Sequence, residues 1–185
     1  MTSMLMAKRR STFRMPSAGD VIVRRIRRSD RLELERFYEA LDPESRRLRF
    51  FAMTTGLDDR LSAQFCTPDH DHAEGFVAET LPRDGVERQI VGHLCLEPDR
   101  PHAAEVAIAV SERYQGRGLG RRLLDAAVGW ARQAGMLRLT ATMYATNAPI
   151  QHLLRGLGLP FRVESLEPDL TSITIDVDAS ASIAA

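Results

Sequence analysis

Short apolar runs bounded by turn residues recur along the chain, and each run is typical of a β-strand. They cover residues 21–26, 75–79, 89–96, 105–110, 137–144, 161–166 and 172–177. The loops between the second, third and fourth runs are too short for a crossover helix. We therefore expect these three strands to pair antiparallel.

Helical periodicity fills the segments between these runs. The main helix is predicted at residues 118–134, and its apolar face carries Leu119, Leu123, Ala127, Trp130 and Ala134. Further helices are predicted at 30–41, from residue 42 onward, at 57–65 and at 148–157, with Asp30 and Asp42 as N-caps. The pattern as a whole predicts an α/β (α+β) fold, in which helices pack on a mixed sheet.

Length and composition indicate a single globular domain. The 185 residues carry 25 basic and 25 acidic side chains, so no bulk positive field points to nucleic acid. We expect a flexible arm at residues 1–20, the domain at 21–177 and a flexible tail at 178–185. No apolar run is long enough to span a membrane. Cys66 and Cys95 form no CxxC pair, which favours reduced thiols in the cytoplasm. A homodimer is compatible with the sequence, which does not fix the oligomeric state.

The stretch Gln115-Gly116-Arg117-Gly118-Leu119-Gly120-Arg121 follows an apolar run and opens the main helix. A helix start offers unpaired N–H groups and the positive end of the helix dipole, and glycines let a ligand approach the backbone closely. Together these features form a seat for a phosphate group. The stretch lacks the lysine of a Walker loop, and its glycines have the wrong spacing for a dinucleotide fingerprint. The structural alternative is a tight turn with a solvated arginine patch.

Gln115, Gly118 and Gly120 of this stretch resemble the Q/R-x-x-G-x-G/A signature of the GNAT superfamily of N-acetyltransferases. The flanking residues agree, and 145–147 with 156–159 resemble the family's second conserved region. Segments 24–30 and 48–51 are similar to the acetyltransferase domains of bacterial protein-lysine acetyltransferases. The resemblance covers most of residues 21–177. It implies a mostly antiparallel sheet, acetyl-coenzyme A (acetyl-CoA) as cosubstrate and no metal.

The resemblance also implies where the cofactor binds. The strand before the loop would pair with the pantetheine arm, and the loop would hold the pyrophosphate on its N–H groups. The cofactor-binding residues expected from it are Ile108, Ala109, Val110, Gln115, Gly116, Arg117, Gly118, Leu119, Gly120, Arg121 and Asn147. Asn147 is also the predicted N-cap of the helix at 148–157.

Glu105 is the candidate general base. An alkylamine is mostly protonated at neutral pH, so direct acetyl transfer needs a group that removes a proton. Glu105 stands in an otherwise apolar strand, and Ala107 and Ala109 follow on its face. These small neighbours leave room for a substrate, and we expect partial burial of the carboxylate. The resemblance places a glutamate of bacterial protein acetyltransferases at this position. The structural alternative is an exposed or salt-bridged glutamate at a strand start.

The chain departs from the family pattern at Leu154, where many members carry a tyrosine that protonates the leaving thiolate. Tyr144 and Tyr114 are the possible substitutes. We expect an N-acetyltransferase that acts on a primary amine, with protein lysine slightly favoured over a small-molecule amine. The alternative is a non-catalytic acetyl-CoA-binding sensor or scaffold, and Leu154 is its best support.

Other charged and metal-ligating residues have both functional and structural interpretations. Asp69, His70, Asp71 and His72, with the more distant His93, could suggest a metal site, but adjacent ligands on one short loop match no zinc spacing. The arginines at 24, 25, 27 and 28 could touch nucleic acid, although charge runs are usually solvated faces. Arg46, Arg47 and Arg49 could line a site for an acidic acceptor or form surface salt bridges.

Overall fold

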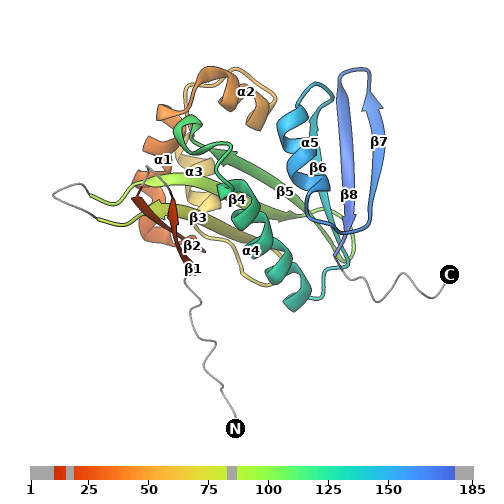
Figure 1. The fold of residues 1–185 in the computed structure, drawn as a ribbon, viewed down its shortest axis with the longest axis horizontal. Helices are drawn as coiled ribbons and strands as arrows, with labels where there is room; N and C mark the ends of the chain where they lie inside the picture. Colours follow the sequence, from red (N-terminus) through yellow and green to blue (C-terminus); the bar gives the residue numbers. More distant parts are fainter. Residues whose placement is uncertain (1–10, 16–18, 83–86, 178–185) are drawn as a thin grey trace, which may run out of the picture.

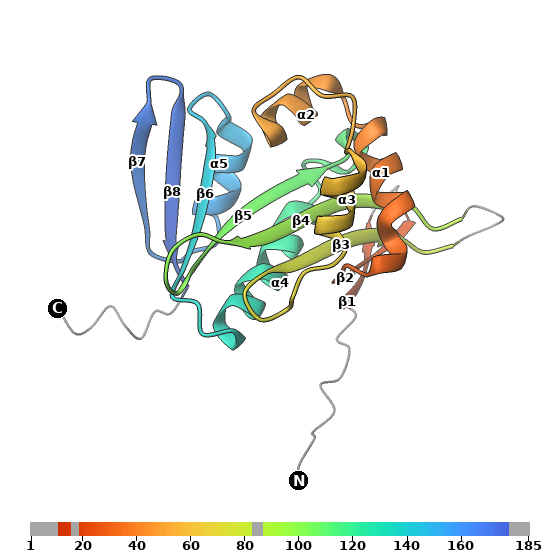
Figure 2. The same ribbon diagram turned by 180° about the vertical axis from the view of Figure 1, so that it is seen from behind.

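A computed structural model describes residues 11–15, 19–82 and 87–177. One eight-stranded sheet runs through the molecule in the order β1-β2-β3-β4-β5-β6-β8-β7. Helices lie on both faces of this sheet (Figure 1 and Figure 2). Neighbouring strands are antiparallel except for β5 and β6, which are parallel. The expected mixed, mostly antiparallel sheet flanked by helices is confirmed.

The strands from β2 onward follow the apolar runs of the sequence closely, whereas β1 lies where no strand is predicted. They are β1 (Ser11–Met15), β2 (Gly19–Arg25), β3 (Glu74–Thr80), β4 (Ile90–Pro98), β5 (Ala103–Val110), β6 (Arg138–Tyr144), β7 (Phe161–Glu167) and β8 (Leu170–Asp176). The antiparallel pairing expected for β3, β4 and β5 is confirmed.

The helices divide between the two faces of the sheet. They are α1 (Arg31–Ala40), α2 (Pro43–Phe50), α3 (Asp59–Phe65), α4 (Leu119–Gln133) and α5 (Ala148–Arg155). The apolar face of α4 packs on one side of the sheet together with α5, and Leu119, Leu123, Ala127 and Trp130 are buried there. Residues of α1 and α3 form a second core on the other side. Figure 1 has α4 in front of the sheet, and Figure 2 has α1 and α3 in front.

Side-chain caps begin two of the helices as predicted. Asp42 accepts a hydrogen bond from the Glu44 amide at 2.9 Å, and Asn147 accepts one from the Ile150 amide at 3.4 Å. Asp30 stands at the N-cap position of α1 but makes no cap hydrogen bond, so that prediction is wrong. Its carboxylate instead forms an ion pair with Arg24 and accepts from the Arg27 amide.

The beginning of the chain differs in part from the expectation of a flexible arm. Ser11–Met15 forms the edge strand β1, which pairs antiparallel with β2, so this part of the expected arm is ordered in the sheet. Residues 1–10 and 16–18 and the expected tail at 178–185 lie outside the described residues. Within the described ranges, no helix has the length and apolar character needed to cross a bilayer.

Strands β5 and β6 stay together over a short distance only. Their register covers Ala103–Glu105 against Arg138–Thr140. Beyond these pairs β5 continues along β4 to Val110, and β6 continues along β8 to Tyr144. Figure 2 shows the two strands diverging from this shared end. The second half of β5 therefore presents backbone groups on the side that β6 has left.

Candidate active site

A cavity of about 700 Å³ opens where β5 and β6 separate. On one side it is lined by the glycine-rich loop, the start of α4 and α5, and we call this the cofactor half. On the other side it is lined by α2, α3 and the end of β4, and we call this the acceptor half. Because the cavity passes between two strands, ligands entering from opposite faces of the sheet can meet beside β5.

The glycine-rich loop has the backbone conformation that its sequence predicts. Gly116 and Gly118 have φ angles of 66° and 82°, in the left-handed region that favours glycine. Gly120 has a different role, because a Cβ there would lie 2.8 Å from Leu153 Cδ2 on α5 and the Leu153 side chain would have to shift. All three glycines line the cavity, so the backbone at the start of α4 is open to a ligand. This is the arrangement of an anion-binding helix start.

The structure brings most of the expected cofactor residues together. The cavity is lined by Ile108, Ala109, Val110, Gln115, Gly116, Gly118, Gly120, Arg121 and Asn147. Arg117 is exposed outside the lining, and the Leu119 side chain is 1% exposed in the core, so Leu119 can offer a ligand only its backbone. The Gln115 side chain donates to the Val110 carbonyl at 2.8 Å, which ties the loop to the end of β5.

Leu154, at which the chain departs from the family pattern, lies on α5 and forms part of the cavity wall. Leu154 lines the cavity and is 2% exposed. Tyr114 is buried in the core, and Tyr144 stacks against Phe51 with ring centroids 5.4 Å apart. None of the three tyrosines of the chain, all within the described ranges, lines the cavity. Neither Tyr144 nor Tyr114 is therefore placed to replace the missing tyrosine.

Two carboxylates face each other in the acceptor half. Glu105 on β5 lies directly opposite Glu97 on β4 in the antiparallel register, and both side chains line the cavity. Glu105 is exposed, so the partial burial expected from the sequence is not found. Glu97 is half-buried, and this burial raises the pKa of its carboxyl group, while Gln64 and Arg49 act in the opposite direction. Sequence reasoning missed Glu97, although the register of two antiparallel strands joined by a short loop could have indicated it.

Arg49 is the one of the three α2 arginines that lines the cavity. Its Nη2 donates to Cys95 Sγ at 3.1 Å, and its guanidinium lies over the rings of Phe50 and Phe65 at 4.9 and 5.5 Å. Its Nε is buried and has no hydrogen-bond partner. Arg46 instead donates to the Glu39 carbonyl of α1 and to the Thr54 carbonyl in the loop after α2, and Arg47 pairs with Glu44.

Beneath Arg49 lies a buried polar pair. The Tyr38 hydroxyl and His93 Nδ1 are 2.9 Å apart, and His93 Nε2 has no partner. Burial lowers the pKa of His93 to about 3, with a smaller contribution from the charge of Arg49, and burial raises the pKa of Tyr38 to about 12. Both groups are therefore neutral at physiological pH.

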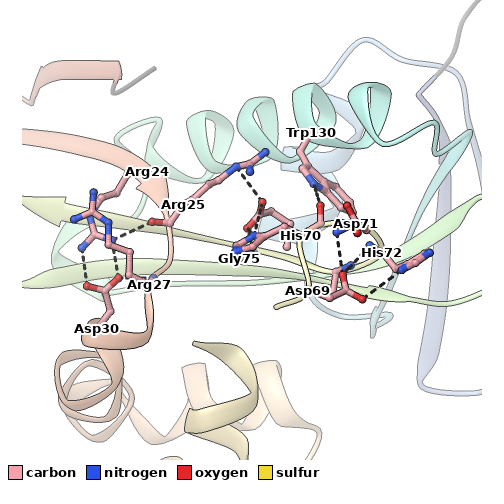
Figure 3. Close-up of polar contacts among 12 residues, drawn as sticks. Arg24, Arg25, Arg27, Asp30, Asp69, His70, Asp71, His72, Gly75 and Trp130 are labelled. Atoms are coloured by element: carbon pink, nitrogen blue, oxygen red, sulfur yellow. Dashed lines mark hydrogen bonds and ion pairs between the residues drawn. The ribbon is translucent and has the colours of Figure 1, made fainter. Parts of the chain in front are cut away.

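The competing sites suggested by the sequence have structural roles (Figure 3). Asp69 accepts from the backbone amides of the loop that it begins, and His70 Nδ1 lies 3.1 Å from Glu74 Oε1. Trp130 donates to the His70 carbonyl at 3.3 Å, which fixes the loop on α4. Among the described residues, no group of three or more candidate ligands could hold a metal ion. Arg24 is buried and pairs with Asp30 and Glu79 instead of facing a nucleic acid.

Comparisons with known proteins agree with this architecture. The model of the acetyltransferase (GNAT) family matches residues 32–159. Acetyltransferase PA5475 of Pseudomonas aeruginosa is 26% identical over 149 residues, which cover 80% of this chain and 78% of the relative.

Solved structures of the same fold are also similar. The GNAT domain of S. lividans PAT superposes with a TM-score of 0.77 at 24% identity, covering 90% of this chain and 96% of that domain. The yncA protein of Salmonella typhimurium, solved with its cofactor acetyl-CoA, gives a TM-score of 0.68 at 19% identity, covering 86% and 95%. These likenesses support the fold.

The chain belongs to the GNAT family, because the family model spans well over half of its length. It is an acetyltransferase that uses acetyl-CoA as its donor. The glycine-rich loop and the open edge of β5 are the features of the cavity that agree with this class.

Proposed function

We propose that this acetyltransferase transfers the acetyl group to the nitrogen of a primary amine by direct attack, with Glu105 as the general base. One observation carries the proposal. The Glu105 carboxylate lines the cavity at the last residue pair before β5 leaves β6. Glu105 stands in the acceptor half, on the strand β5 that also borders the cofactor half, so an amine beside it would meet a thioester held along β5.

Glu105 removes a proton from the ammonium group, directly or through one water molecule. The free nitrogen then attacks the carbonyl carbon of the thioester, so that a C–N bond forms and the C–S bond breaks. Backbone N–H groups of β5 beyond Glu105 polarise the carbonyl oxygen, as an oxyanion hole does. Leu154 has no proton to give, so a water molecule takes the second proton from the nitrogen as the amide forms and passes a proton to the departing thiolate.

The donor is held by the residues named from the family resemblance. The pantetheine arm extends the sheet along the free edge of β5 at Ile108, Ala109 and Val110. The pyrophosphate binds at the N–H groups of 116–121, and Arg121 adds positive charge. Asn147 combines its role as helix cap with a contact to the pantetheine arm. The left-handed glycines and the open helix start support this arrangement.

The acceptor is a primary amine of one of two kinds. The resemblance of segments 24–30 and 48–51 supports a lysine side chain of a protein. The fold is also that of a protein named ribosomal-protein-alanine N-acetyltransferase from Brucella melitensis, with a TM-score of 0.65 at 24% identity. The alternative acceptor is a small-molecule amine, and the size of the cavity is compatible with it.

The test is thiol release from acetyl-CoA by wild-type protein and Glu105→Gln, with lysine peptides and a panel of small amines. We expect amine-dependent release that falls by at least about tenfold in the variant, because a positioned base contributes that much or more. Glu164→Gln on the exposed strand β7 is the matched control and should keep full turnover.

Two results would contradict the proposal in different ways. Undiminished turnover by Glu105→Gln would remove Glu105 from the mechanism but leave the enzyme. Absence of turnover with every amine, although acetyl-CoA raises the melting temperature, would favour a sensor or scaffold instead.

A further inference from the structure

The acceptor half of the cavity contains a half-buried positive charge that the mechanism above does not use. Arg49 reaches into the lining from α2, with Phe50 and Phe65 beside its guanidinium. Its neutral polar neighbours are the Cys95 thiol and, beyond it, the Tyr38 hydroxyl. No carboxylate within the described ranges forms an ion pair with it, and the charges of Glu105 and Glu97 act on it only from beyond ion-pair distance. Its buried Nε has an unused hydrogen.

This environment is costly unless a ligand completes it. A guanidinium taken out of water needs an anion or several hydrogen-bond acceptors, and a thiol and aromatic rings supply neither in full. The buried Arg24, by comparison, is neutralised directly by Asp30 and Glu79. The planar guanidinium is best matched by a carboxylate, which can accept two parallel hydrogen bonds.

The opposite charge lies a short distance along the same strands. Cys95, which Arg49 contacts, is the cross-strand partner of Ala107, and the next residue pair on this face is Glu97 with Glu105. Like charges directly opposite each other in a sheet repel, and a cation between them relieves the repulsion. The acceptor half therefore has a place for an ammonium group at the carboxylates and a place for an anion at Arg49.

We propose that the acceptor is a small primary amine that also carries a carboxylate, such as a free amino acid. Its amine lies between Glu97 and Glu105, and its carboxylate binds Arg49. This inference rests on the proposed function and selects the small-molecule acceptor of the two named above. A lysine side chain of a protein carries no carboxylate to meet Arg49.

The experiment compares pairs of acceptors that differ only in the carboxylate. Lysine is paired with cadaverine and phenylalanine with phenethylamine, and a lysine-containing peptide with blocked ends is included. We measure kcat/KM for thiol release by wild-type protein, Arg49→Met and Arg49→Lys. Arg47→Met is the matched control, because Arg47 lies on the same helix but outside the cavity lining.

Wild-type protein should prefer each carboxylated acceptor over its partner by at least about tenfold, because a site built for a charged group rejects an analogue that lacks it. Arg49→Met should lose this preference by slowing only the carboxylated acceptors, and Arg47→Met should retain it. Arg49→Lys should recover part of it. Equal rates for the members of each pair in wild-type protein, or an equal loss for all acceptors in Arg49→Met, would overturn the inference.

A binding measurement separates this inference from the proposed function. Calorimetric titration of the same acceptor pairs into the protein saturated with coenzyme A detects the carboxylate preference without turnover. Tighter binding of the carboxylated members, with no acetyl transfer, would contradict the proposed function and support the acceptor site. Turnover without any carboxylate preference would support the proposed function and contradict the acceptor site. The comparison of acceptor pairs uses wild-type protein, so it stands even where Arg49→Met fails to fold.

Discussion

His93 should make the protein lose stability in mild acid. Its side chain is fully buried, its Nδ1 is occupied by Tyr38 and its Nε2 has no partner. Burial holds its pKa at about 3 in the folded protein, whereas the pKa of histidine in an unfolded chain is about 6.5. Between these values the unfolded state binds a proton that the folded state does not bind. The free energy of unfolding therefore falls as the pH falls through this window.

The size of the effect follows from the two pKa values. Below pH 6.5 the loss approaches about 1.4 kcal/mol per pH unit, which amounts to about 2 kcal/mol between pH 7 and pH 5. Most carboxylates begin to protonate only below this range, so the window isolates the histidine. Urea unfolding at several pH values measures the slope, and the buried Trp130, the single tryptophan of the chain, reports unfolding by fluorescence.

The variant His93→Asn keeps an acceptor near the position of Nδ1 and removes the titrating group. It should be less stable at pH 7, because the smaller side chain leaves a cavity, but it should lose much less stability between pH 7 and pH 5. His102→Asn, at an exposed position with φ of 58°, is the control and should retain the wild-type slope. An unchanged slope in His93→Asn would refute the argument.

Two further predictions concern the backbone and the buried ion pairs. Gly118→Ala should lower the free energy of unfolding by about 1–2 kcal/mol, because the φ of Gly118 is 82°. Gly129→Ala inside α4 should raise it by up to about 1 kcal/mol. Denaturant unfolding checks that the two changes in stability have opposite signs. Arg24→Met should cost about 3–5 kcal/mol because it leaves Asp30 buried without its cation and Glu79 with Arg88 alone, 3.7 Å away. Arg162→Met at an exposed pair should cost less than about 1 kcal/mol. Thermal unfolding of Arg24→Met and Arg162→Met compares these costs, and equal losses of stability in these two variants would contradict this account.

The parts of the site that depend on local chemistry could be predicted from the sequence. The glycine-rich loop and the Asn147 cap each depend on residues within one turn of chain, so their spacing is visible before the fold is known. The position of Glu105 in an apolar strand was equally visible. Its environment was not, because the exposure of Glu105 depends on where β6 departs, and β6 begins some thirty residues later.

Contacts between distant segments account for what the sequence did not indicate. Arg24 meets Glu79, 55 residues away, so its run of arginines resembled a solvated basic face. Arg49 was considered for an acidic acceptor together with Arg46 and Arg47, since nothing in the sequence distinguishes the three. Their roles differ because only position 49 on α2 faces the end of β4 at Cys95. Helical phase relative to a sheet is fixed by packing, which a single sequence does not display.

The opening between β5 and β6 provides the space for a ligand in this fold. The apolar pattern of the two strands does not reveal this opening. The strand pattern of each is uninterrupted in the sequence, because β5 stays paired with β4 from Ala104 to Val110 and β6 stays paired with β8 along its whole length. At the opening, the start of α4 meets α5 and β5, because the Cβ direction of Gly120 is bordered by Leu153 on α5 and Ile108 on β5. Glycine at position 120 thus serves packing as well as ligand approach. A Cβ at this position would lie 2.8 Å from Leu153 Cδ2 and the Leu153 side chain would have to shift, so the glycine lets α5 pack close to the start of α4.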